Sequence, residues 1–161
     1  MQPDSDAIIL DAIHEAKVLG IFKTFCEKHK SDEEMRKIRT ILSYSSNKEH
    51  SLSVLLLREQ NETVERPEIT RILQLVTAFL KKSTLRKPIE QGLKQELLEE
   101  QNYKCAFCGT KVDLSSHADH IVPFKYVGDE LADNMQMLCQ ACNEKKKASM
   151  DYQVKVLLKL V

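Results

Sequence analysis

Two pairs of cysteines are the residues of this 161-residue chain whose type and spacing are best suited to hold a metal ion. Cys105 and Cys108 form one C-x-x-C pair, which Gly109 follows to allow a tight turn, and Cys139 and Cys142 form the other. Four thiolates complete a tetrahedral zinc site that leaves no position open for water, so such a site is structural. We expect a structural Zn²⁺ ion here; the alternative is a redox dithiol or free buried thiols.

A second group of polar residues lies between and after these pairs, and its members suit phosphodiester cleavage. That reaction requires an activated water, a cation at the phosphate and help for the leaving oxygen. Imidazole changes charge near neutral pH, so His120 is the natural general base. Successive strand residues face opposite sides, so Asp119 points away from His120, and His117 shares the face of Asp119. The side-chain oxygen of Asn143 suits a hard cation such as Mg²⁺.

The residues around this group resemble the motif of the HNH endonucleases. The matching stretches are DHIVP at 119–123, DNMQMLC at 133–139 and CNEKK at 142–146. The resemblance covers roughly residues 103–149 and implies a ββα-metal finger, in which two strands and a helix surround a divalent ion. It implies a metal-dependent endonuclease that hydrolyses phosphodiester bonds in DNA, with Mg²⁺ or Mn²⁺ as the catalytic ion.

The resemblance also implies roles for single residues. The residue at the position of Asp119 binds the metal, the histidine at His120 faces the water, and the residue at Asn134 positions the histidine ring. Asn143 stands where many members carry a histidine, and we expect it to share the divalent ion with Asp119. Members often carry lysines near phosphates just after this position, but three consecutive helical residues spread around the helix, so one or two should contact phosphate. The candidate nucleic-acid contacts are His117, Lys145, Lys146 and Lys147.

Helical periodicity and capping residues predict the elements that must position these groups. Asp4 or Ser5 is expected to cap the first helix, Ser31 the second, and prolines to open two later ones. The pattern of residues 51–60 fits either a helix or a strand. Strands are expected at 118–121 and 135–138, and a helix from about Gln140. The remaining predicted helices are 5–28, 32–42, 67–80, 88–101 and 151–161, and a strand is the alternative for the last of these.

The fold class that follows is α+β and mostly helical. We expect a helical domain over residues 1–101 and a zinc-stapled ββα nuclease finger over residues 102–161. No motif in the first domain carries chemistry, so specificity, oligomerisation or partner docking is its expected role. Cys26 is interpreted as a small buried residue on a helix, and the basic residues 81–87 as a solvated loop.

Composition sets further bounds on function. The chain is 42% hydrophobic and 30% charged, which is typical of a globular protein, and it has no apolar run long enough to cross a membrane. The first residues lack the features of a secretion signal, so we expect a cytoplasmic protein. The net charge is zero, so attraction to phosphate must come from local clusters of basic residues or from bound metal.

Three functions fit these observations. The first is a DNA endonuclease of a restriction, phage-defence or mobile-element system. A partner protein could deliver its substrate, and residues 1–101 could bind that partner or a second copy of the chain. The second is the same chemistry on RNA. The third, from another class, is a zinc-ribbon module that binds nucleic acid or protein without catalysis. The Asp119–His120 pair favours an enzyme, because a binding module needs no acid–base group beside its zinc site.

Overall fold

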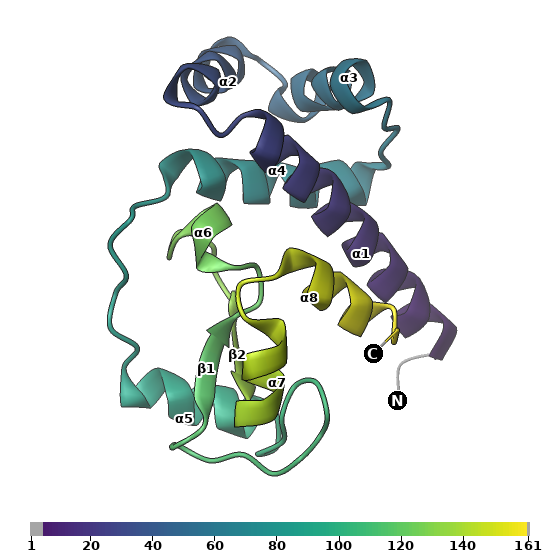
Figure 1. Cartoon of the computed structure of the whole chain (residues 1–161). Coiled ribbons are helices and arrows are strands. Elements are labelled where there is room, and N and C mark those ends of the chain that lie inside the picture. Colours follow the sequence, from purple (N-terminus) through teal and green to yellow (C-terminus); the bar gives the residue numbers. More distant parts are fainter. Residues whose placement is uncertain (1–4, 161) are drawn as a thin grey trace.

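The structure is a computed structural model, and it describes residues 5–160. It is mostly helical with one two-stranded antiparallel sheet, which confirms the predicted α+β class (Figure 1). No helix in the described part of the chain combines the length and the hydropathy needed to cross a bilayer. The elements are α1 (Ser5–Lys28), α2 (Asp32–Tyr44), α3 (Lys48–Gln60), α4 (Arg66–Lys81), α5 (Gln91–Glu100), β1 (His117–His120), α6 (Phe124–Val127), β2 (Met135–Leu138), α7 (Gln140–Lys146) and α8 (Met150–Leu157).

The helix starts follow local capping chemistry. At the start of α2 the Ser31 side chain accepts a hydrogen bond from the Glu34 amide, as predicted. Residues 51–60 are helical as part of α3. α5 begins at Gln91, so the prediction of a helix from residue 88 was wrong by one turn, because the chain is still extended at its N-cap. The alternative cap Asp4, and the last residue of the final predicted helix, lie outside the described residues.

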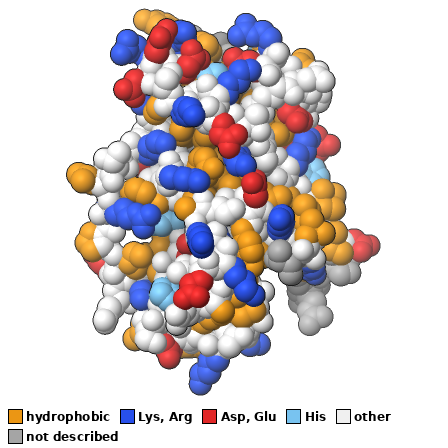
Figure 2. Space-filling model, viewed as in Figure 1, with side chains coloured by type: hydrophobic (Ala, Val, Ile, Leu, Met, Phe, Trp, Pro, Cys, Tyr) orange, Lys and Arg blue, Asp and Glu red, His pale blue; other side chains and the backbone are white. Residues whose placement is uncertain are grey.

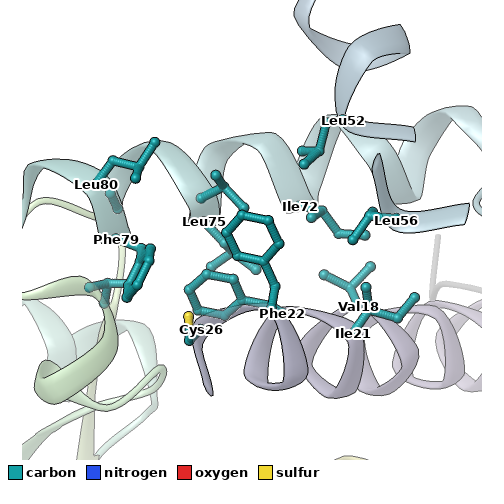
Figure 3. Close-up of a cluster of buried hydrophobic side chains, with 14 of the residues drawn as sticks. Val18, Ile21, Phe22, Cys26, Leu52, Leu56, Ile72, Leu75, Phe79 and Leu80 are labelled. Atoms are coloured by element: carbon teal, nitrogen blue, oxygen red, sulfur yellow. The ribbon is translucent and has the colours of Figure 1, made fainter. Parts of the chain in front are cut away.

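The larger hydrophobic core lies between α1, α3 and α4 and continues into the C-terminal third. Figure 3 shows its side chains between α1 and α4, where Phe22 and Phe79 meet edge to face at 6.4 Å between ring centroids. Cys26 lies in this core with 3% of its surface exposed, which confirms its interpretation as a buried residue. Three residues from beyond position 120 complete it: Val122, Val127 and Met150. The helical group and the finger therefore share one core.

A second, smaller core lies beneath the four paired cysteines. α5 contributes Leu97 and Leu98 to it, and β2 contributes Met137 and Leu138. The Gln101 side chain pairs with the β2 backbone, accepting from the Met137 amide (2.7 Å) and donating to the Met137 carbonyl (3.0 Å). α5 is thus packed on the finger, and the domain boundary at residues 101–102 stays a prediction.

The finger is a ββα arrangement whose sheet fixes the candidate site residues. β1 and β2 are antiparallel, with His120 opposite Met135 and Asp119 opposite Gln136. β2 and the start of α7 lie where the sequence predicted them. β1 begins and ends one residue earlier than predicted, because His117 already pairs with Leu138 and the last paired residue is His120, opposite Met135. The two short strands thus hold Asp119 and His120 at the edge of the shared core.

The segment between α4 and α5, residues 82–90, runs along the finger, and we call it the connector (Figure 1). Lys82 Nζ donates to the Lys125 carbonyl (2.7 Å) and the Lys87 amide donates to Asp129 Oδ2 (2.8 Å). Gly128 lies directly against it: a Cβ built there would sit 3.1 Å from Lys82 Cβ and 3.3 Å from the Ser83 carbonyl oxygen. The connector is therefore closely packed against the finger and hydrogen-bonded to it.

Replacing Gly128 by alanine should lower the free energy of unfolding by about 1–3 kcal/mol. The backbone there has φ 59° and ψ −140°, a region that residues with a Cβ rarely adopt, and the new methyl group would push against the connector. Urea unfolding measures the change. The matched control is Gly20→Ala in the middle of α1, where nothing lies within 4 Å of a built Cβ and alanine should stabilise the helix by about 0.5–1 kcal/mol. Equal effects of the two substitutions would contradict the tight fit of the connector.

Candidate metal centre and active site

The four paired cysteines come together in one cluster, as the sequence predicted. The Sγ atoms of Cys105, Cys108, Cys139 and Cys142 all lie within 4.8 Å of one another. Zinc–sulfur bonds of about 2.3 Å in a tetrahedron require sulfur–sulfur distances of about 3.8 Å. The Cys108 and Cys139 Sγ atoms are 3.7 Å apart, so the donor set fits a structural zinc ion without rearrangement of the backbone.

The first cysteine pair is built on a tight turn. The Cys105 amide donates to the Thr110 carbonyl (2.8 Å) and the Gly109 amide donates to the Cys105 carbonyl (3.0 Å), with Gly109 at φ 72°. Hydrogen bonds with Thr110 lower the pKa of the Cys108 thiol to about 6, whereas burial raises the pKa of the Cys142 thiol. Thiolates bind metal and thiols do not, so loading this site must release protons.

His120 is held by a carboxylate that the sequence analysis did not identify. Its Nε2 lies 2.8 Å from Asp129 Oδ1, and both side chains are largely buried. Burial alone would raise the pKa of Asp129, but hydrogen bonds from the Lys87 amide and the His120 ring hold that pKa below its usual range. Asp129 is therefore ionised at neutral pH and can only accept, so Nε2 carries the proton and Nδ1 is left as the basic nitrogen.

Asp119 points into the finger and is fixed from two sides. Lys146 Nζ lies 2.7 Å from Asp119 Oδ2, and the Gln136 side chain donates to the same oxygen (3.1 Å). The Lys146 side chain has no exposed surface, and its ammonium group also donates to the His120 carbonyl (2.6 Å). A buried charge is stable only when paired and hydrogen-bonded, so this pair locks Asp119 beside the backbone of His120.

Asn134 is buried and acts on the backbone that follows His120. Its side chain accepts from the Val122 amide (2.8 Å) and donates to the Val122 carbonyl (2.9 Å), while its own carbonyl accepts from the Ile121 amide. Among the described residues it makes no hydrogen bond to the imidazole ring. It fixes the turn after β1, and with it the position of the His120 backbone.

One pocket of about 560 Å³ brings several of the predicted residues together, but not Asn134, which lines a separate cavity with His120. Asp119, His120 and Asn143 line the 560 Å³ pocket, and so does the exposed His117 on β1. The Asn143 side chain makes no hydrogen bond within residues 5–160, which leaves its amide oxygen available to a ligand. One carboxylate and one amide oxygen facing one pocket are donors of the kind that hard divalent cations take.

The comparisons with known proteins agree with this geometry. Residues 105–149 match the family model of the HNH endonucleases. This match and the four-cysteine cluster confirm the resemblance seen in the sequence. It covers the zinc cluster, both strands and α7, and not the helices before them. No curated protein and no solved structure gave a significant match to the chain.

The three lysines at the end of the HNH segment have different environments. Lys145 and Lys147 are exposed, and Lys147 lines the pocket. Lys146 is buried and its donors are used by Asp119 and the His120 backbone, so it is not available to a phosphate. Helical geometry already indicated that the three could not share one face.

Basic residues outside the HNH segment also reach the pocket. Arg86 and Lys87, in the connector, line it together with His120, although the sequence analysis took them as a solvated loop. The Arg86 guanidinium lies over the Phe124 ring, 4.6 Å from its centroid. The available signal was a cluster of basic residues just before α5, but only the packing of α4 and α5 places it at this pocket. In Figure 2 basic side chains gather over this part of the visible face, with histidines among them.

Proposed function

We propose that the protein is a metal-dependent endonuclease that hydrolyses phosphodiester bonds in DNA. The observation that carries this proposal is the pocket in which a carboxylate-held histidine, His120, lies beside the oxygen donors Asp119 and Asn143. The HNH match supports a nuclease in general. The Asp129 contact also fixes which ring nitrogen of His120 carries the proton, which a general base requires and a binding module does not.

In the proposed reaction His120 Nδ1 takes a proton from the attacking water. Asp129 keeps the proton on Nε2 and stabilises the positive charge that the ring gains, in the manner of the carboxylate that orients a histidine base in other hydrolases. Asn134 keeps the turn after His120 rigid, so that the ring does not drift from the water. Asp119 and Asn143 are the proposed holders of the divalent ion, Mg²⁺ or Mn²⁺. Such an ion, when bound, neutralises charge on the scissile phosphate and on the leaving oxygen.

Lys146 is proposed to orient Asp119 rather than to touch substrate. Its ammonium group and the Gln136 side chain both bond Oδ2 of the carboxylate, and neither bonds Oδ1. Lys147 and His117 remain proposed contacts to phosphate, since both are exposed and line the pocket. Lys145 is exposed as well but does not line this pocket, so it is a proposed contact only for phosphates farther along the strand. The zinc ion at the four cysteines has no open position and is proposed to be structural.

The decisive experiment is incubation of supercoiled plasmid with the purified protein and Mg²⁺ or Mn²⁺, with EDTA as the control. Metal-dependent nicking supports the proposal, and a parallel incubation with RNA shows which nucleic acid is preferred. If neither is cut while either is bound, a zinc-ribbon binding module becomes the better description. Restriction, phage defence or a mobile element is the proposed setting, and residues 1–101 the proposed unit for specificity, oligomerisation or partner docking.

Asp129→Asn should slow cleavage by roughly 10²-fold or more, because it reverses the protonation of the histidine ring. The Lys87 amide needs an acceptor at this side chain, so the asparagine oxygen would face Lys87 and its NH₂ would face His120 Nε2. Nε2 would then accept, and the proton would move to Nδ1, where it blocks the base. Single-turnover cleavage measures the loss.

Measuring which nitrogen of His120 is protonated distinguishes a positioning role of Asp129 from a purely structural one. In ¹⁵N NMR spectra of the wild type, His120 Nε2 should have the chemical shift of a protonated nitrogen and Nδ1 that of an unprotonated one. In the Asp129→Asn protein the assignment should be reversed. Asn134→Asp is the contrasting variant: it disturbs the turn after β1 but leaves Asp129 in place, so its His120 should keep the proton on Nε2. A wild-type cleavage rate in Asp129→Asn would remove Asp129 from the mechanism.

A further inference from the structure

The connector carries positive charge that the HNH segment does not account for. Arg86 and Lys87 are exposed, and neither forms an ion pair with a carboxylate in residues 5–160. The Arg86 guanidinium is held against Phe124 (4.6 Å), and the Phe124 ring meets the His120 ring edge to face at 5.5 Å. An arginine stacked on an aromatic ring loses little further freedom when its N–H groups bind a phosphate. Arg86 is therefore positioned close to the candidate base in a conformation that can bind a phosphate.

The two cavities that His120 lines differ in their balance of charge. The smaller pocket, of about 560 Å³, has three basic residues, Arg86, Lys87 and Lys147, against two acidic ones, Asp119 and Glu144. Asp119 is itself paired with the buried Lys146. The larger cavity, of about 900 Å³, has one basic residue, Lys87, and five acidic ones: Glu90, Glu96, Glu100, Asp129 and Asp133. A polyanion approaching His120 is therefore attracted by the smaller pocket and repelled by the larger cavity.

We propose that the connector forms part of the nucleic-acid interface, with the Arg86 guanidinium bound to a backbone phosphate next to the scissile one. This rests on the proposed nuclease function. The strand enters over the smaller pocket, between the connector on one side and Lys147 of the finger on the other. The larger, acidic cavity stays free of nucleic acid.

The anchoring of the connector explains how a segment outside the motif serves the site. Lys82 ties it to the finger backbone at Lys125, and the Lys87 amide ties it to Asp129, the residue that holds His120. The phosphate contact and the base are thus positioned by the same carboxylate. A phosphate seated at Arg86 is consequently fixed relative to the basic nitrogen of His120.

The test compares Arg86→Gln with Arg58→Gln, which removes the same charge from an exposed residue of α3. Both are made in the His120→Ala background, so that a fluorescent DNA duplex is bound in the presence of Mn²⁺ without being cut. Arg86→Gln should weaken binding about tenfold at low salt and reduce the slope of log K against log salt by about 1. Arg58→Gln should leave both values unchanged.

The same substitution in the active protein supplies a second readout. Arg86→Gln should raise KM for DNA about tenfold while kcat falls much less, since the contact is made equally in the bound and transition states. If the wild type cuts DNA and Arg86→Gln matches it in affinity, salt slope and KM, the connector proposal fails and the nuclease function stands. If the wild type neither binds nor cuts DNA or RNA, both proposals fail.

Discussion

Replacing His120 by alanine should reduce the rate of nucleic-acid cleavage by about 10²–10⁴-fold, the usual loss for a positioned general base. Without the imidazole, no group at the end of β1 can take the proton from the attacking water. The ring is held by Asp129 and lies against Phe124, so its removal leaves the backbone hydrogen bonds of the β1–β2 sheet intact. Single-turnover cleavage of plasmid at saturating protein concentration measures the effect on the chemical step.

Substitution of His120 should disturb the stability of the fold less than substitution of its neighbour Asp119. Asp119→Ala would leave the fully buried Lys146 ammonium without its carboxylate, and breaking one partner of a buried pair costs about 3–5 kcal/mol in stability. His120→Ala leaves only Asp129, which still accepts from the Lys87 amide. The matched control is His50→Ala, at an exposed position on α3, which should cut at the wild-type rate. An undiminished rate in a folded, zinc-loaded His120→Ala protein would refute the assignment of the base.

The parts of the site that were predictable from the sequence are those set by short-range spacing. A C-x-x-C pair with a following glycine specifies a turn that presents two thiolates. Such a turn needs only a few residues of local geometry. The start of α7 at Gln140 follows for the same reason, since Cys139 comes directly after the strand and occupies the N-cap position of the helix. Strand alternation alone would have separated Asp119 from His120, whereas both line one pocket.

The parts that were not predictable depend on where distant segments pack. Asp129 lies nine residues after His120 in a loop, and nothing in its own neighbourhood marks it as the partner of the ring. Arg86 and Lys87 reach the pocket only because α4 packs in the large core while α5 packs beneath the zinc cysteines, which stretches the connector across the finger. The burial of Lys146 likewise required knowing that Asp119 points inward to meet it.

Packing also determines the secondary structure of one segment among the first hundred residues. Residues 51–60 have an apolar run that suits a strand as well as a helix. They are helical because Leu52, Leu55 and Leu56, on one face of α3, fill the large core. The basic cluster of residues 81–87 was correctly taken as exposed at Arg86 and Lys87, and its place beside His120 is the feature that sequence patterns did not contain.

Cys105→Ser should abolish tight zinc binding and unfold the zinc-bearing part of the finger while most of the helical signal remains. The core beneath the cysteines is small: it rests on Leu97, Leu98, Met137, Leu138 and a few neighbours. Structural zinc contributes about 10–16 kcal/mol to the folding of zinc-finger peptides, far more than such a core supplies. The larger core is shared with the finger, but most of its buried residues come from α1, α2, α3 and α4, so these helices should persist. Elemental analysis and circular dichroism measure the two effects, with about one zinc per chain expected in the wild type.

Cys26→Ser provides the matched control, because it makes the same atomic change at a cysteine in the other core. It buries a hydroxyl between α1 and α4, so it should lower the stability of the helical group but leave the zinc content at one per chain. We therefore expect opposite results for the two serine variants. The Cys105→Ser protein should lose its zinc ion and the structure of the finger. The Cys26→Ser protein should keep its zinc ion but have a less stable helical group. Wild-type protein prepared without chelators that contained no zinc, or a Cys105→Ser protein that retained it after dialysis, would show that the four thiolates do not form a zinc site. Loss of cleavage in Cys105→Ser is expected as well, since β2 carries Met135, the strand partner of His120, and ends at the cluster.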